Sequence, residues 1–107
     1  MTATAAVVVL CTAPPSSGRE LAQQLVEERL CACVNVLPAV LSCFRWEGRV
    51  ESAEEMLLVV KTTAAAAPKL RARIVELHPY DVPEVLELPV AGGLPAYLQW
   101  LGDAVAP

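Results

Sequence analysis

Residues 33–62, CVNVLPAVLSCFRWEGRVESAEEMLLVVKT, decide the fold of this 107-residue chain. In the first half, apolar side chains occupy even positions, which is the two-residue alternation of a β-strand. A turn at Glu47, Gly48 and Arg49 follows, and residues 50–62 return as a second strand that begins acidic and ends apolar. The stretch therefore predicts a long hairpin with a solvated tip and a base in the core. The alternating apolar side chains are Val34, Val36, Val40, Phe44 and Trp46.

One proline interrupts the first strand of this hairpin. Pro38 cannot donate a backbone hydrogen bond to a neighbouring strand, so it is tolerated at a sheet edge or at a bulge. We therefore expect the strand to lie at an edge or to bend at this residue.

The segment before the hairpin predicts a strand and a helix. Residues 5–11, AAVVVLC, form a continuous apolar run, which is typical of a central strand buried on both faces. Ser17 and Glu20 have the spacing of a capping box. They introduce an amphipathic helix that we expect to reach about Leu30.

The segment after the hairpin predicts a second helix. It opens at Thr63 or just after it, tolerates Pro68 in its first turn, and ends at His78 and Pro79. The helix is indicated by an apolar stripe with spacing i, i+4, i+7. The stripe consists of Leu70, Ile74 and Leu77.

Two short elements complete the chain. Residues 82–90 contain Pro83 and Pro89, so they predict only a short strand at an edge of the sheet. A last helix follows, with Pro95 in its first turn and Gly102 as its expected C-cap.

The resulting order, βαββαβ plus a terminal helix, predicts an α+β fold: a ferredoxin-like sandwich with an additional C-terminal helix, in a single domain over residues 1–107. Both inner helices would cover one face of the sheet. Hydrophobic residues make up 55% of the chain and charged residues 19%. Because so much apolar surface exceeds what one small domain buries, we expect the open face to be covered by another chain.

Composition also excludes several classes of protein. The net charge is −4, which gives no electrostatic basis for binding nucleic acid. No apolar stretch is long enough to span a membrane. The first ten residues carry no Lys or Arg, so a secretory signal is not expected, and we predict a cytoplasmic protein whose four cysteines are free thiols.

Six short strings, in order along nearly the whole chain, resemble the CutA divalent-cation tolerance family. Any one of these strings is a weak signal, but six in sequence, including the His-Pro-Tyr-x-x-Pro-Glu pattern of residues 78–84, are specific for the family. The six are VVVLCTAP (7–14), CVNVLP (33–38), FRWEGRV (44–50), LVVKTT (58–63), HPYDVPEV (78–85) and LPAYLQWL (94–101).

The resemblance implies a homotrimer of ferredoxin-like subunits in which the hairpin of residues 33–62 is the trimer arm. It also implies a link to copper tolerance and to binding of divalent ions. The metal-associated positions of bacterial members are the Cys of the first string, here Cys11, and two adjacent histidines, here Leu77 and His78. With one histidine replaced, we expect binding to be weak.

The residues themselves leave alternatives open at both metal positions. Cys11 has a soft sulfur ligand suited to copper, but it also fits a packed core thiol. His78 follows a helix, where it can bind a metal or cap the helix end. Two ligands fall short of the four of a structural zinc site, so a tight metal cage within one chain is not expected.

A second group of polar residues is a candidate inter-subunit cleft. Lys61 lies at the end of a strand, and Tyr80, Asp81 and Glu84 fall in one loop. A solvated polar rim is an equally good interpretation of these residues.

The sequence thus predicts a non-enzymatic trimeric protein of divalent-cation tolerance, with no obligatory cofactor and with copper or another divalent cation as a weakly bound ligand at Cys11 and His78. The alternative is a PII-like signalling trimer that binds a small metabolite in the inter-subunit cleft. An acylphosphatase-type enzyme is disfavoured, because residues 12–18 offer no arginine beside an anion-binding loop.

Overall fold

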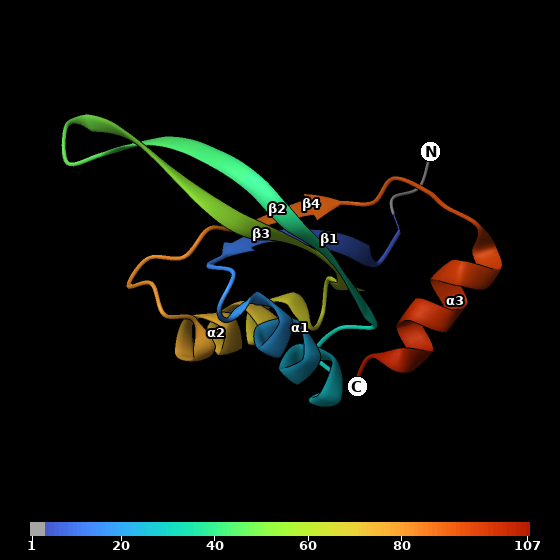
Figure 1. Cartoon of the computed structure of the whole chain (residues 1–107). Coiled ribbons are helices and arrows are strands. Elements are labelled where there is room, and N and C mark those ends of the chain that lie inside the picture. Colours follow the sequence, from blue (N-terminus) through green and yellow to red (C-terminus); the bar gives the residue numbers. More distant parts are fainter. Residues whose placement is uncertain (1–3) are drawn as a thin grey trace.

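The computed structural model describes residues 4–107, and these residues form one antiparallel sheet with strand order β2-β3-β1-β4 (Figure 1). The α+β fold with its βαββαβ order and terminal helix is confirmed. The elements are β1 (Ala6–Ala13), α1 (Gly18–Glu27), β2 (Cys33–Trp46), β3 (Arg49–Thr63), α2 (Ala67–Leu77), β4 (Val85–Pro89) and α3 (Pro95–Ala104).

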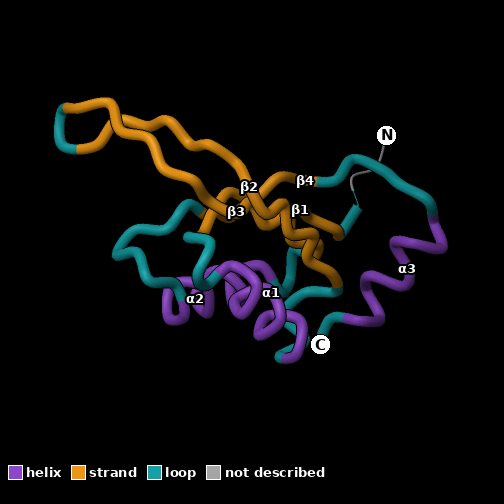
Figure 2. Tube along the Cα trace, viewed as in Figure 1, coloured by secondary structure: helices purple, strands orange, loops and turns teal. Residues whose placement is uncertain are grey.

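Strand β1 is central, as expected, because it pairs with β3 on one side and with β4 on the other. The expectation that both of its faces are buried is wrong. Val7, Val9 and Cys11 lie in the core, whereas the intervening Val8 and Leu10 are only partly buried. The reason is that α1 and α2 cover a single face of the sheet, which leaves the other face open (Figure 2).

The main core lies between the sheet and these two helices. Leu25 of α1 and Leu70 and Ile74 of α2 are fully buried against Leu58 and Val60 of β3. A smaller apolar cluster joins Leu101 of α3 to the start of β1 and to the turn before α2. No helix among the described residues is long and apolar enough to cross a membrane.

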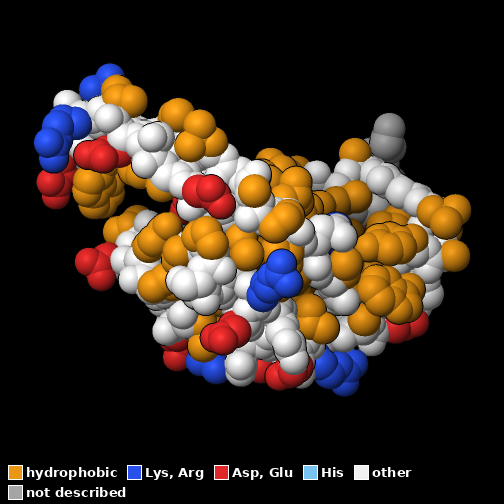
Figure 3. Space-filling model, in the orientation of Figure 1, with side chains coloured by type: hydrophobic (Ala, Val, Ile, Leu, Met, Phe, Trp, Pro, Cys, Tyr) orange, Lys and Arg blue, Asp and Glu red, His pale blue; other side chains and the backbone are white. Residues whose placement is uncertain are grey.

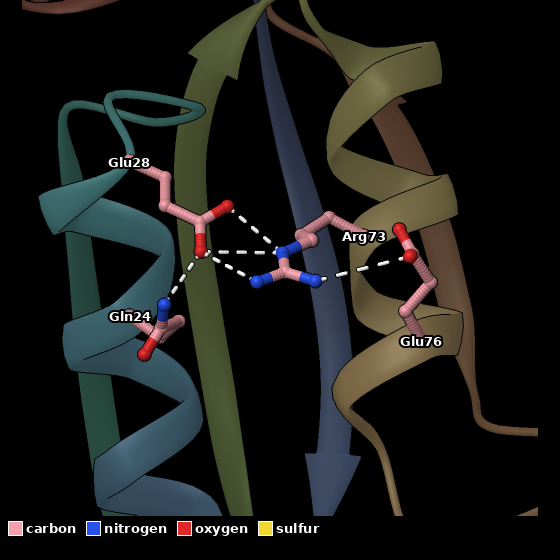
Figure 4. Close-up of polar contacts among 4 residues, drawn as sticks. All are labelled: Gln24, Glu28, Arg73 and Glu76. Atoms are coloured by element: carbon pink, nitrogen blue, oxygen red, sulfur yellow. Dashed lines mark hydrogen bonds and ion pairs between the residues drawn. The ribbon is translucent and has the colours of Figure 1, made fainter.

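An ion pair joins Glu28, directly after α1, to Arg73 of α2 (Figure 4). Arg73 Nε lies 2.8 Å from Glu28 Oε1, and Arg73 Nη2 lies 2.9 Å from Glu28 Oε2. Gln24 Nε2 donates a further hydrogen bond, of 2.6 Å, to the same carboxylate. The hydrogen bonds from Arg73, and next that from Gln24, lower the pKa of Glu28.

The ends of α1 differ from the prediction. Ser17 makes no side-chain capping bond, and its Oγ is buried without a partner among the described residues. The Pro14 carbonyl instead accepts hydrogen bonds from the backbone N–H groups of Ser17 and Gly18, so a turn leads directly into the helix. The helix ends at Glu27 rather than at about Leu30, because Arg29 has a left-handed φ of 59°.

The later helices agree better with their sequence signals. Helix α2 has Pro68 in its first turn and ends before His78, as predicted. Thr63 Oγ1 accepts a hydrogen bond from the backbone N–H of Ala66, just before this helix. In α3 the first-turn position of Pro95 is confirmed, but Gly102 is not a C-cap because the helix continues to Ala104.

The β2–β3 hairpin extends far beyond the rest of the sheet (Figure 1), and we call its distal part, residues 40–55, the arm. Glu47 and Gly48 both have positive φ, of 49° and 79°, as a type I′ hairpin turn requires. The pairing register shifts between Leu37 and Val40, which confirms the predicted irregularity at Pro38.

Large apolar side chains remain exposed on the arm, on β4 and before α3. On the arm, Trp46 is 57% exposed and Val50 is 71% exposed. Leu86 and Leu88 of β4 and Leu94, before α3, are also exposed. Figure 3 shows hydrophobic side chains spread along the arm and over the body beneath it.

Candidate functional site

Two sequence-predicted residues, Cys11 and His78, meet at the end of β1. The loop that follows α2 brings the His78 ring to the Thr12 carbonyl, with Nε2 2.7 Å from the oxygen. The Cys11 thiol donates to the same carbonyl at 3.6 Å. The antiparallel order of the sheet therefore places a thiol and an imidazole around one backbone oxygen.

Both ring nitrogens of His78 are engaged. The backbone N–H of Tyr80 donates to Nδ1 at 3.1 Å, so Nδ1 carries the lone pair. Nε2 therefore carries the proton and donates to the Thr12 carbonyl. The imidazole is neutral in this arrangement and holds the loop against the end of the strand.

Cys11 is a core thiol as well as a member of this group. Its side chain is fully buried among the residues between sheet and helices. Burial, and next the negative charges of Glu84 and Glu55, raise the pKa of Cys11 to about 12. The group is thus protonated at neutral pH, whereas a metal ligand must be the thiolate.

Tyr80 and Glu55 form a partly buried polar contact beside His78. The Tyr80 hydroxyl donates a hydrogen bond of 2.8 Å to Glu55 Oε2, and the Tyr80 ring lies 4.7 Å from the His78 ring. Burial, then the hydrogen bond to Glu55, raise the pKa of Tyr80 to about 12. Sequence analysis missed Glu55, because an acidic run on a hairpin is typical of a solvated surface.

A groove of about 1090 Å³ opens from this contact, between the arm and the loop of residues 80–84. Tyr80, Asp81 and Glu84, which the sequence suggested for a cleft, line it together. Lys61 does not, because it pairs with Val8 near the opposite end of β1. Its ammonium group lies 3.8 Å from the Cys33 sulfur.

The arm forms the second wall of the groove, and the residues of this wall were not predicted from the sequence. Phe44, Trp46 and Glu51 line it together with Glu55. The register pairs Phe44 with Glu51, so the hairpin pattern indicated that these two side chains share a face. Nothing in the sequence indicated that the loop of residues 80–84 lies opposite them.

The geometry limits what the described residues can hold. Within residues 4–107, no three His, Cys, Asp or Glu side chains are grouped so that they can hold a metal ion. A metal at Cys11 and His78 must therefore displace the proton of a buried thiol and one hydrogen bond of the imidazole.

Comparison with known proteins places these features in a family. The family model described as CutA1 divalent ion tolerance protein matches residues 7–104. The chain is 53% identical over 97 residues to the divalent-cation tolerance protein CutA of Thermus thermophilus, covering 90% of this chain and 94% of that one. It is 44% identical to the Pectobacterium atrosepticum protein of the same name over 94% of this chain and 92% of the relative.

Solved structures give the same result. A CutA crystal structure from Xylella fastidiosa superposes with a TM-score of 0.93 at 36% identity, covering 96% of this chain and all of that one. A structure described as the PII-like protein CutA from Nostoc, in apo form, has a TM-score of 0.90 at 34% identity, with 94% and 97% of the two chains covered.

Proposed function

The chain belongs to the CutA1 divalent ion tolerance family, and we propose that it acts in divalent-cation tolerance as a non-enzymatic homotrimer that weakly binds copper or a related ion. Cys11 and His78 are the proposed ligands. The observation that carries this proposal is the shared Thr12 carbonyl, which brings a soft sulfur and an imidazole nitrogen together at one sheet end.

Weak binding follows from the state of these two groups. The thiol must lose a proton whose pKa is about 12, and the ring must give up a hydrogen bond of 2.7 Å. Deprotonation of the thiol and loss of the hydrogen bond both make the free energy of metal binding less favourable. Because one proton is released, the affinity is expected to rise by about tenfold per pH unit below the thiol pKa.

The buried state of Cys11 also supports a non-enzymatic role. A protonated, inaccessible thiol is a poor nucleophile, although a cysteine beside a histidine is the usual arrangement for covalent catalysis. Both ring nitrogens of His78 are hydrogen-bonded to backbone groups, so neither is available to act as a base toward Cys11.

Exposed apolar surface supports the trimer. The arm and the open sheet face present Trp46, Val50, Leu86 and Leu88 to solvent in a single subunit. Contiguous apolar surface of this kind marks an interface, and identical copies with closed symmetry are its commonest partners.

Copper titration tests the proposed ligands. Cu(I), supplied without oxygen and in competition with a colorimetric chelator, is titrated into the parent protein and into Cys11→Ser and His78→Ala. We expect each variant to bind more than about tenfold more weakly. Cys43→Ser is the matched control, because Cys43 is an exposed thiol on the arm, and it is expected to bind like the parent. Unchanged binding by both ligand variants would refute the site.

A second function, a PII-like trimer that binds a metabolite between subunits, is favoured by a different observation. The groove of about 1090 Å³ is of the size that small organic ligands occupy, and it is far larger than an ion needs. The similar Nostoc protein is itself described as PII-like.

A further inference from the structure

The groove between the arm and the loop of residues 80–84 has carboxylates on both of its walls. Glu51 and Glu55 come from the arm, and Asp81 and Glu84 come from the loop. Arg45 is the only Lys or Arg among the lining residues. Figure 3 shows the arm standing off the body above this hollow. The negative charge favours a cationic occupant over an anionic one.

Glu55 is the most buried of the four carboxylates that line the groove. Its side chain is only 6% exposed, and none of the ion pairs among the described residues involves it. Its Oε2 accepts the Tyr80 hydroxyl, which is a neutral donor, and Oε1 makes no hydrogen bond within the described residues. Glu55 Oε1 is therefore available to accept a charge-assisted hydrogen bond from a cationic ligand in the groove.

Aromatic side chains surround the same space. Phe44 and Trp46 line the groove from the arm, and Tyr80 lines it from the loop. The faces of such rings attract cations, and the effect is strongest for Trp. The exposed Leu41 and Val82 add apolar surface that can cover the body of a ligand.

The carboxylates do not form a metal site. No group of three metal-ligating side chains comes together among residues 4–107, so the charges are spread along the groove. Spread carboxylates, aromatic faces and apolar walls together match an extended organic cation.

We infer that this groove binds a small organic cation, a protonated amine or guanidinium compound with an apolar body, and that Glu55 receives its charged group. The inference rests on the second proposed function, because it names the ligand class of the PII-like cleft. It uses neither Cys11 nor His78, the proposed copper ligands.

Calorimetric titration with matched probes tests the charge requirement. Tryptamine and agmatine supply an ammonium or guanidinium group, and indole-3-propionate carries the same ring as tryptamine with a carboxylate in place of the amine. We expect saturable binding of tryptamine or agmatine and none of indole-3-propionate. Equal binding of tryptamine and indole-3-propionate, or no saturable binding of either cation, would overturn the inference.

Variants locate the site within the groove. Glu55→Gln is expected to weaken binding of the cationic probe about tenfold, as loss of a charge-assisted hydrogen bond does. Glu84→Gln, at an exposed position where folding is not at risk, is expected to weaken it in the same direction. Glu54→Gln is the control, because Glu54 is exposed on the same strand and does not line the groove. Equal affinities for all three variants would place the probe elsewhere and refute the assignment.

Light scattering on the same samples tests the assembly separately from the class of ligand. A trimer that binds no cation would refute the ligand class and leave the proposed assembly intact. A monomer that binds the cationic probe at Glu55 would support the ligand class and refute the inter-subunit cleft.

Discussion

The two ends of the β2–β3 hairpin share one backbone ladder and differ in everything that surrounds it. At the base, Leu58 and Val60 are fully buried beneath α1 and α2. On the arm, Trp46 and Val50 lie mostly in solvent. Apolar side chains are thus buried within the subunit at one end of the hairpin and largely exposed at the other.

The difference indicates that the body and the arm depend on different contacts. The body is held by contacts within one subunit, so its substitutions should change the free energy of unfolding. We propose that other copies cover the arm, so its substitutions should change assembly.

The largest effect is expected in the body. Leu58→Ala removes a fully buried side chain from the core and should lower the free energy of unfolding by about 3 kcal/mol. Val75→Ala, at an exposed position on α2, should change it by less than about 0.5 kcal/mol. Urea denaturation followed by circular dichroism measures both, and similar losses would contradict the proposed core.

The next effect concerns the arm. Val50→Asp places a charge on its apolar surface and should weaken assembly by about 2 kcal/mol, more than tenfold in the dissociation constant. The far-ultraviolet circular dichroism spectrum of the subunit should not change. Sedimentation at a series of concentrations measures the dissociation constant, and an unaltered value would show that the arm is not at an interface.

A smaller effect is expected at the tip of the arm. Gly48 has a φ of 79°, and no atom lies within 4 Å of the position that a Cβ would take. Gly48→Ala should therefore cost about 1 kcal/mol through backbone strain alone. Urea denaturation of the variant measures this cost, and no loss of stability would mean that the turn can adopt another conformation.

The smallest effect is a dependence on pH. Because the folded-state pKa of Glu28 is lowered from 4.5, its pair with Arg73 stabilises the body above pH 4.5, and this contribution is lost as the pH falls below that value. The stability of Arg73→Leu should therefore approach that of the parent protein in acid.

An ion pair on the arm provides the control for this experiment. Arg49 and Glu51 lie 3.9 Å apart and are well exposed. Such a pair contributes little, so Arg49→Leu should leave unfolding unchanged at every pH. Thermal melts from pH 7 to pH 3 compare the two variants. A parallel loss for both at all pH values would contradict the assignment to Glu28.

The order of elements could be predicted from the sequence because it depends on local periodicity. The alternation in residues 33–46 and the single proline at Pro38 were enough to predict a long strand with an irregularity. Helix ends were harder to predict. Ser17 is preceded by a turn that feeds directly into α1, and Gly102 lies within α3, so each residue type was present without its usual role.

The candidate site was predictable only where the chain itself keeps residues together. Tyr80, Asp81 and Glu84 share one loop and line one groove. Lys61 lies at the far end of β1, because antiparallel pairing places it opposite Val8. Glu55 was missed because its hydrogen-bond partner, Tyr80, lies 25 residues away in the chain.

The mass of the native protein in dilute buffer tests the central claim, that identical neighbours cover the arm and the open face of the sheet. The account predicts that light scattering gives three times the 11.4 kDa mass of the chain. A mass of 11.4 kDa, with Trp46 and Val50 left in solvent, would contradict it.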